Sequence, residues 1–208
     1  MVEGVHAYQD HMSTGIQSTH RLMLELTRHG YDDLGWQLLT NRTFPSWGYM
    51  IENGATTIWE RWDGYVKGRG FQDPGMNSFN HWAFGAVGEW MFRNLAGINP
   101  DEQNPGYKHF VIRPRPAPSL TWVKASYDSI RGRIESQWHR DGDTFTLDAL
   151  VPPNTTAMVL FPTSSPSSVR EGSTPAANAR EVRFVGIQDG VVAFEVGSGQ
   201  YHFTAKMP

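Results

Sequence analysis

The chain has 208 residues, no cysteine and a formal net charge of −3. The length suits one large or two small domains, and the lack of cysteine excludes a disulfide scaffold, a thiol nucleophile and a thiolate metal site. The weak negative charge disfavours a nucleic-acid partner or an anionic membrane as binding partner. No apolar run is long enough to cross a bilayer. Residues 1–6 do not resemble a signal peptide, and the compartment is left open.

The first hundred residues carry helical patterns. A first helix is predicted from Thr14 to the His29-Gly30 pair, followed by a shorter helix that Asp32 or Asp33 caps. Residues 46–77 are rich in glycine and predict an extended, functional loop region. A third helix is predicted from Asn80 to Ala96 with Ser78 or Asn80 as its cap. Its apolar side chains lie nearly all round, Trp82 among them, which suits the inner ring of a helical barrel.

After Asn99-Pro100 the pattern changes to short segments typical of strands. Residues 134–138 and 145–149 alternate between apolar and polar side chains, whereas 157–161 is continuously apolar. Strands are predicted at 134–138, 145–149, 157–161, 182–187, 191–196 and 201–205, with a hairpin turn at Asp141-Gly142. Residues 163–180 are rich in serine, proline and alanine and predict a surface loop. The spacing favours an antiparallel β-sandwich, so the chain divides into a helical part, 1–100, and a β part, 101–208.

Eight tryptophans make the sequence rich in aromatic side chains. Aromatic core packing is the ordinary explanation, and stacking on sugar rings is the more specific one. The scattered histidines predict no metal site, and there is no phosphate loop, no zinc motif and no serine-hydrolase motif, so no cofactor is expected.

The densest group of polar and aromatic residues surrounds Glu60, which lies between Trp59 and Trp62 with Arg61 beside it. A partly desolvated carboxyl group of this kind suits sugar hydrolysis, which uses two carboxyl groups. The residues alone leave two alternatives open, an ion pair with an arginine and simple exposure.

A second group contains His81, placed near the start of the third helix. A neutral imidazole at a helix N-terminus suits recognition of hydroxyl groups. The alternative is a histidine whose hydrogen bonds are satisfied by a loop carbonyl.

Two motifs resemble bacterial α-L-rhamnosidases: Gly54-Ala55-Thr56-Thr57-Ile58-Trp59-Glu60-Arg61-Trp62 and Met76-Asn77-Ser78-Phe79-Asn80-His81-Trp82-Ala83-Phe84-Gly85. The similarity extends from about residue 11 to about residue 162 and is most specific in these two motifs. It implies part of an (α/α)6 toroid followed by a β-sandwich, and inverting hydrolysis of terminal α-L-rhamnosides without a metal. It also implies that Glu60 is the general base and that His81 binds the sugar. We add Trp59 and Trp62 as walls of the pocket.

The resemblance also shows a departure from the family, whose members are several times longer. Their acidic segment, which supplies the general acid, has no counterpart here. The expectation is therefore a C-terminal fragment that is a poor or inactive enzyme alone, with a homo-oligomer or the rest of the barrel as partner. The other possibilities are a non-catalytic sugar-binding or assembly module, and an (α/α)6 enzyme that acts on another sugar, such as a phosphorylase or a lyase.

Overall fold

The computed structural model describes residues 1–208, which divide into two compact units, Met1–Trp90 and Met91–Pro208. Unit 1 is mainly helical, and unit 2 is built from two mainly antiparallel β-sheets. The chain is therefore of mixed α and β structure. None of its helices combines the length and the apolar character needed to cross a membrane.

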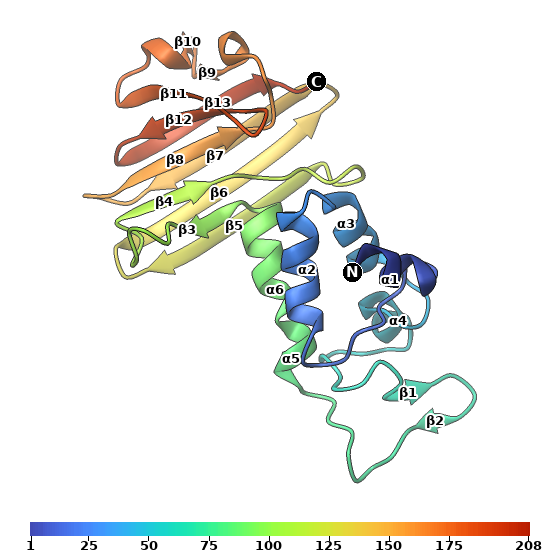
Figure 1. Ribbon diagram of the computed structural model, residues 1–208. Helices are drawn as coiled ribbons and strands as arrows, with labels where there is room; N and C mark the ends of the chain where they lie inside the picture. The colour runs from blue at the N-terminus through green and yellow to red at the C-terminus, as the bar shows by residue number, and fades with distance from the viewer. The chain divides into compact units, whose positions relative to one another are not determined.

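Unit 1 contains six short helices and one small hairpin (Figure 1). They are α1 (Val2–Ala7), α2 (Thr19–Arg28), α3 (Asp32–Thr40), α4 (Trp47–Glu52), β1 (Tyr65–Val66), β2 (Gly70–Phe71), α5 (Trp82–Gly85) and α6 (Val87–Trp90). Helix α2 contacts α3, α5 and α6, and the Trp90 indole donates a hydrogen bond of 2.8 Å to the Thr27 hydroxyl.

Helix α2 ends where the sequence predicts. Gly30 has φ +80°, and the amides of Gly30 and Tyr31 donate to the carbonyls of Thr27 and Leu26. This left-handed end is a Schellman motif, which favours glycine because glycine has no Cβ. The start is different, because α2 begins at Thr19 rather than at Thr14.

Two other helical predictions and one loop prediction need correction. Tyr31 is the residue before α3, so Asp32 and Asp33 lie in its first turn, where they complement the helix dipole, rather than capping it. The glycine-rich region 46–77 is not a simple loop, because it contains α4 and the β1–β2 hairpin. The third helix begins at Trp82, is interrupted at Ala86 and ends in a π-helical turn, η1 (Met91–Leu95).

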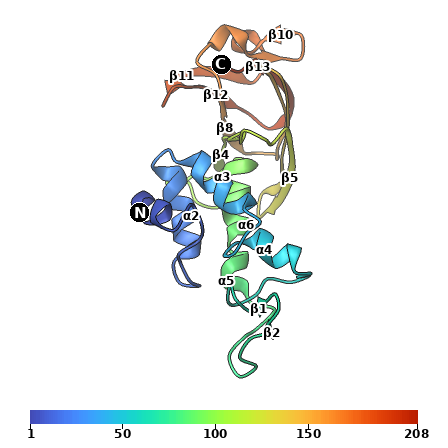
Figure 2. The ribbon, with the colours of Figure 1, turned by 90° about the vertical axis from the view of Figure 1, so that its right-hand side faces the viewer.

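Unit 2 consists of two sheets, which Figure 2 shows as two layers. The six-stranded sheet has the order β10 (Thr174–Pro175), β9 (Arg170–Glu171), β13 (Gly199–Lys206), β7 (Thr144–Val151), β6 (Gly132–Asp141) and β5 (Trp122–Ser129). The five-stranded sheet has the order β11 (Val182–Gln188), β12 (Val191–Val196), β8 (Thr156–Phe161), β4 (His109–Ile112) and β3 (Ile98–Pro100).

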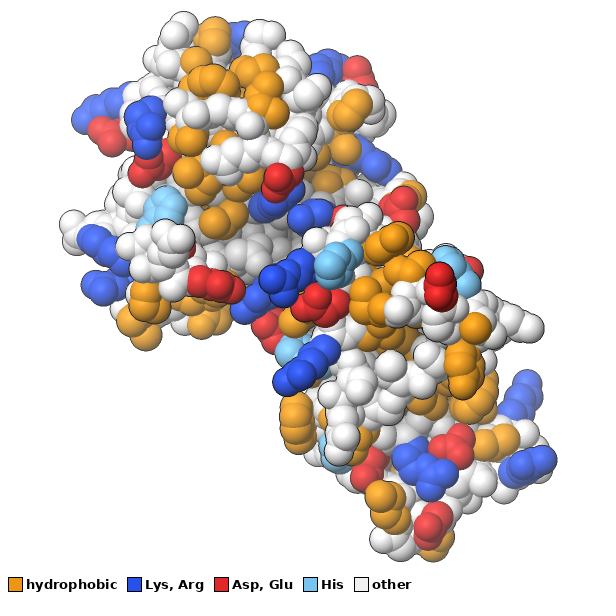
Figure 3. All heavy atoms as spheres, viewed as in Figure 1, with side chains coloured by type: hydrophobic (Ala, Val, Ile, Leu, Met, Phe, Trp, Pro, Cys, Tyr) orange, Lys and Arg blue, Asp and Glu red, His pale blue; other side chains and the backbone are white.

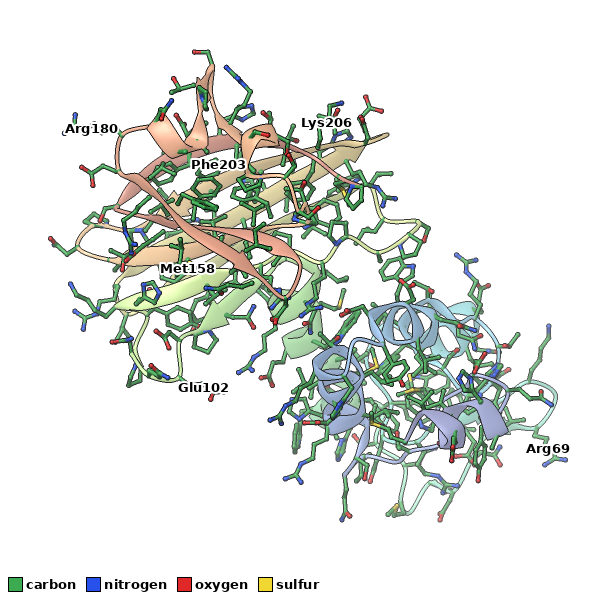
Figure 4. All side chains as sticks on the ribbon, turned by 45° about the horizontal axis from the view of Figure 1, so that its top comes forward. Arg69, Glu102, Met158, Arg180, Phe203 and Lys206 are labelled. Carbon is green, nitrogen blue, oxygen red and sulfur yellow. The ribbon has the colours of Figure 1, made fainter.

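The core of unit 2 lies between these sheets. Inward-facing side chains of both form one apolar cluster, in which Phe203 of β13 is fully buried (Figure 4). Every predicted strand of this region is present. The sandwich is not wholly antiparallel, because β4 and β8 pair in parallel. Three intervening strands, β5 to β7, belong to the other sheet, so the chain returns to β4 by a long crossover connection.

Region 163–180 is also more ordered than the sequence predicts. It contains two short 3₁₀ turns, η2 (Pro166–Ser168) and η3 (Ala176–Asn178), and the strands β9 and β10. Val169 and Ala176 are fully buried in the core cluster. These two apolar residues anchor the segment, although its composition is that of a loop.

Gly97 is a position where only glycine fits. Its φ is +82°, and a Cβ would lie 2.3 Å from the backbone of Arg113 and Pro114. We expect Gly97→Ala to lower the free energy of unfolding of unit 2 by about 2–5 kcal/mol, from left-handed strain and overpacking together. Gly142 is the matched control, because it also has a positive φ, +56°, but nothing within 4 Å of a Cβ. Gly142→Ala should cost about 1–2 kcal/mol. Urea unfolding of both variants measures the difference, and equal losses would contradict the role of the contact.

Candidate functional site

The two sequence motifs lie side by side in unit 1. The amide of Glu60 donates to the carbonyl of Ser78 at 2.8 Å, and the amide of His81 donates to the carbonyl of Ile58 at 2.9 Å. These bonds join two loops that are about twenty residues apart in the sequence. Glu60 and His81 are thus carried on one hydrogen-bonded framework.

One oxygen of the Glu60 carboxylate accepts a hydrogen bond that orients the group, and the other oxygen is free. Its Oε2 accepts a hydrogen bond of 2.8 Å from the amide of Ser78. Its Oε1 accepts none within the chain, and the side chain is half-buried. A carboxylate held in this way has a fixed direction and one oxygen available to accept a proton.

Arg61 makes its ion pair with Asp63 instead of Glu60. Nε and Nη2 of Arg61 donate to the two oxygens of Asp63, each at 3.0 Å. The Asp63 carboxylate raises the pKa of the Arg61 guanidinium through these hydrogen bonds and its charge. The pairing occupies Arg61, so the alternative in which this arginine neutralises Glu60 is not the arrangement observed.

His81 is itself the N-cap of α5, which corrects the prediction of Ser78 or Asn80. Its Nδ1 accepts a hydrogen bond of 3.2 Å from the amide of Ala83. An accepting Nδ1 carries no proton, so a neutral ring carries its proton on Nε2. Nε2 makes no hydrogen bond within the chain, and it is a donor available to a hydroxyl group.

Trp59 and Trp62 pack in the aromatic cluster beneath these loops. Trp59 is only 4% exposed and meets Phe79 edge-on, with ring centroids 5.7 Å apart. Trp62 stacks on Phe84 at 3.9 Å, and its indole donates to the Thr14 carbonyl. Both indoles hold the loops in place, and a wall of a sugar pocket stays a prediction for them.

Trp82 is the aromatic residue of the site that the sequence places wrongly. The sequence predicts that Trp82 belongs to a helix buried on most faces, whereas its side chain is 79% exposed. Its ring lies nearly parallel to that of His81, at 14°, with centroids 6.2 Å apart. Trp82 is as apolar as its buried neighbours Ala83 and Phe84, so residue type alone does not show that it is exposed. Its exposure follows from its place at the start of α5.

Two family models match the chain. Residues 1–95 match the model described as the bacterial alpha-L-rhamnosidase 6 hairpin glycosidase domain. Residues 97–175 match the model described as the bacterial alpha-L-rhamnosidase C-terminal domain. The two matched ranges include both candidate-site loops and most of unit 2.

Full-length relatives are similar over nearly the whole chain. An alpha-L-rhamnosidase of Streptomyces avermitilis is 45% identical over 98% of the chain, and one of Formosa agariphila is 37% identical over 99%. The chain spans 19% and 22% of these proteins. Among solved structures, the Streptomyces avermitilis alpha-L-rhamnosidase complexed with L-rhamnose has a TM-score of 0.90, at 45% identity and over 99% of this chain and 19% of that one. The alpha-L-rhamnosidase of Dictyoglumus thermophilum has a TM-score of 0.83 at 32% identity, over 97% of this chain and 22% of that one.

Proposed function

Since this chain belongs to the bacterial α-L-rhamnosidase family, we propose that its two loops supply the general base and part of the sugar subsite of a glycoside hydrolase. The substrate is a terminal α-L-rhamnoside, and the reaction proceeds with inversion. The observation that carries the proposal is the Glu60 carboxylate, which the Ser78 amide holds while Oε1 stays free. The helices of unit 1 are, in this proposal, part of an (α/α)6 toroid.

In the proposed reaction, Oε1 of Glu60 accepts a proton from a water molecule as that water attacks the anomeric carbon. The hydrogen bond to Oε2 keeps the carboxylate in one rotamer and so aims Oε1. Nε2 of His81 donates to a hydroxyl group of the sugar, and the exposed indole of Trp82 lies next to it. Inverting hydrolases place the acid and the base about 6.5–9.5 Å apart, on opposite faces of the sugar.

The general acid comes, we propose, from a segment outside these residues. Asp63 is the carboxylate nearest to Glu60 in the sequence, and both of its oxygens accept from Arg61. Both oxygens of Asp63 therefore contact the guanidinium, and neither is free to contact a leaving group. Without the acid, a glycoside whose leaving group needs protonation should react slowly.

Exposed apolar side chains of unit 1 support the proposal of a partner. Tyr31, Phe44, Ile51, Phe71 and Trp82 are all exposed, and orange side chains gather at several places on the face shown in Figure 3. The proposed partner is the rest of the barrel or a second copy of the chain, because such side chains are usually covered.

The proposed sugar-binding role of His81 can be separated from its role as the N-cap of α5. His81→Asn keeps an acceptor at the N-cap but lacks an Nε2 donor, whereas His81→Ala removes both. We expect both variants to bind L-rhamnose about 10-fold more weakly or worse, because a sugar hydroxyl loses its partner. Only His81→Ala should also lose about 1 kcal/mol of stability. Titration calorimetry and urea unfolding measure the two effects, and undiminished binding by His81→Asn would overturn the assignment.

A further inference from the structure

The outer face of the six-stranded sheet carries an ordered group of six side chains. They come from three neighbouring strands and form two rows across β5, β6 and β7. The register places Trp122, His139 and Thr146 in one row, and Lys124, Gln137 and Asp148 in the next. Because alternate residues of a strand point to the same face, all six project away from the core.

These residues line a hollow of about 430 Å³ in unit 2, whose remaining lining residues are Val123 and Trp138. Pockets that bind small molecules have volumes of about 300–1,000 Å³. The hollow is therefore large enough for a small ligand. It lies wholly within unit 2, whereas the Glu60 loops belong to unit 1.

Trp122 is the apolar part of this surface. It is 58% exposed on the edge strand β5, and its indole N–H donates no hydrogen bond within the chain. The residues beside it in the two rows are polar or charged. One flat apolar ring with polar groups around it differs from the broad apolar patch that a protein partner would cover.

The polar groups suit a neutral ligand with many hydroxyl groups. Lys124 and Asp148 balance each other in charge, and a single carboxylate is too few for a metal site. The Gln137 amide, the His139 ring and the Thr146 hydroxyl each donate and accept hydrogen bonds. Asp148 is held by His202 at 2.6 Å, which fixes the direction of its carboxylate.

We propose that this surface binds a neutral saccharide. The C–H face of a pyranose ring lies on the Trp122 indole, and the sugar hydroxyls meet Lys124, Gln137 and Asp148. A saccharide combines an apolar face with a rim of groups that both donate and accept, as the surface requires. The proposal does not depend on the hydrolase activity proposed for unit 1.

Residue-resolved NMR of the ¹⁵N-labelled chain tests the proposal, with L-rhamnose, D-galactose and D-glucose as probes. Binding of at least one sugar should move the indole N–H signal of Trp122 and the amide signals of Lys124, Gln137 and Asp148 in a saturable way. Signals of residues 57–60 and 78–82 report the site in unit 1 separately. Either proposal can therefore fail while the other stands.

Trp122→Ala should weaken this binding at least about tenfold, as expected when a stacking tryptophan is removed. Because Trp122 is exposed, the sheet should stay folded in this variant, and circular dichroism checks that it does. Ile187→Ala is the matched control, because Ile187 is an exposed apolar residue of β11 in the other sheet. It should leave the sugar shifts unchanged. Absence of shifts on the β5–β7 face with all three sugars, or shifts that persist undiminished in Trp122→Ala, would overturn the proposal.

Discussion

The chain alone is expected to hydrolyse 2,4-dinitrophenyl α-L-rhamnoside. Its kcat/KM on 4-methoxyphenyl α-L-rhamnoside should be lower than that on the dinitrophenyl substrate by about 10²–10⁴-fold, which is the usual contribution of a general acid. Dinitrophenolate leaves without protonation, so a site with only the base can release it. Methoxyphenolate is far more basic and needs a proton. The values of kcat/KM over a series of substituted phenyl rhamnosides measure this dependence.

The pH profile is an independent control for the same prediction. A bell-shaped profile requires both a base and an acid. With the base alone, the rate on the dinitrophenyl substrate should show no descending limb at higher pH, because that limb reports the general acid. A flat dependence on the leaving group, together with a bell-shaped profile, would mean that the chain supplies its own acid.

Glu60→Gln should lower kcat/KM for 2,4-dinitrophenyl α-L-rhamnoside by about 10²–10⁴-fold. Glutamine has nearly the same shape, and its carbonyl oxygen can still accept the Ser78 amide, so the loop should keep its structure. The amide cannot take a proton from water. Azide needs no such base, so added azide should restore turnover in the variant and give a rhamnosyl azide of inverted configuration.

Glu52→Gln is the matched control for this substitution. Glu52 is an exposed glutamate at the end of α4, paired with Arg42 at 2.8 Å, and it belongs to the same unit. Its replacement should leave kcat/KM unchanged. Full activity in Glu60→Gln, or an equal loss in both variants, would contradict the assignment of Glu60 and favour a non-catalytic sugar-binding module.

The sequence predicts best the features that a few neighbouring residues determine. The end of α2 depends on Gly30, the strands β6 and β7 depend on alternating side chains, and β8 depends on a continuous apolar run. Strand β5 escapes prediction because, as an edge strand, it has only exposed and half-buried residues, and its alternating pattern contains few strongly apolar side chains. The segment 163–180 escapes because Val169 and Ala176 are buried by strands that are distant in the sequence.

The same limit applies to the candidate site. The two motifs identify Glu60 and His81 as the residues of interest, by resemblance. Local patterns contain nothing that pairs residues 58–60 with 78–81, or that directs Arg61 to Asp63 rather than to Glu60. Those arrangements follow from the aromatic cluster that packs the loops together, in which Met50, Trp59 and Phe84 are buried. Such contacts between distant segments appear only in the folded chain.

A crystal structure of the chain with L-rhamnose would show whether Glu60 and His81 face the sugar. We expect a sugar hydroxyl within about 3.2 Å of His81 Nε2, and Oε1 of Glu60 facing the anomeric carbon through one water molecule. Rhamnose bound in unit 1 away from His81, or a Glu60 Oε1 turned away from the sugar, would contradict the proposal.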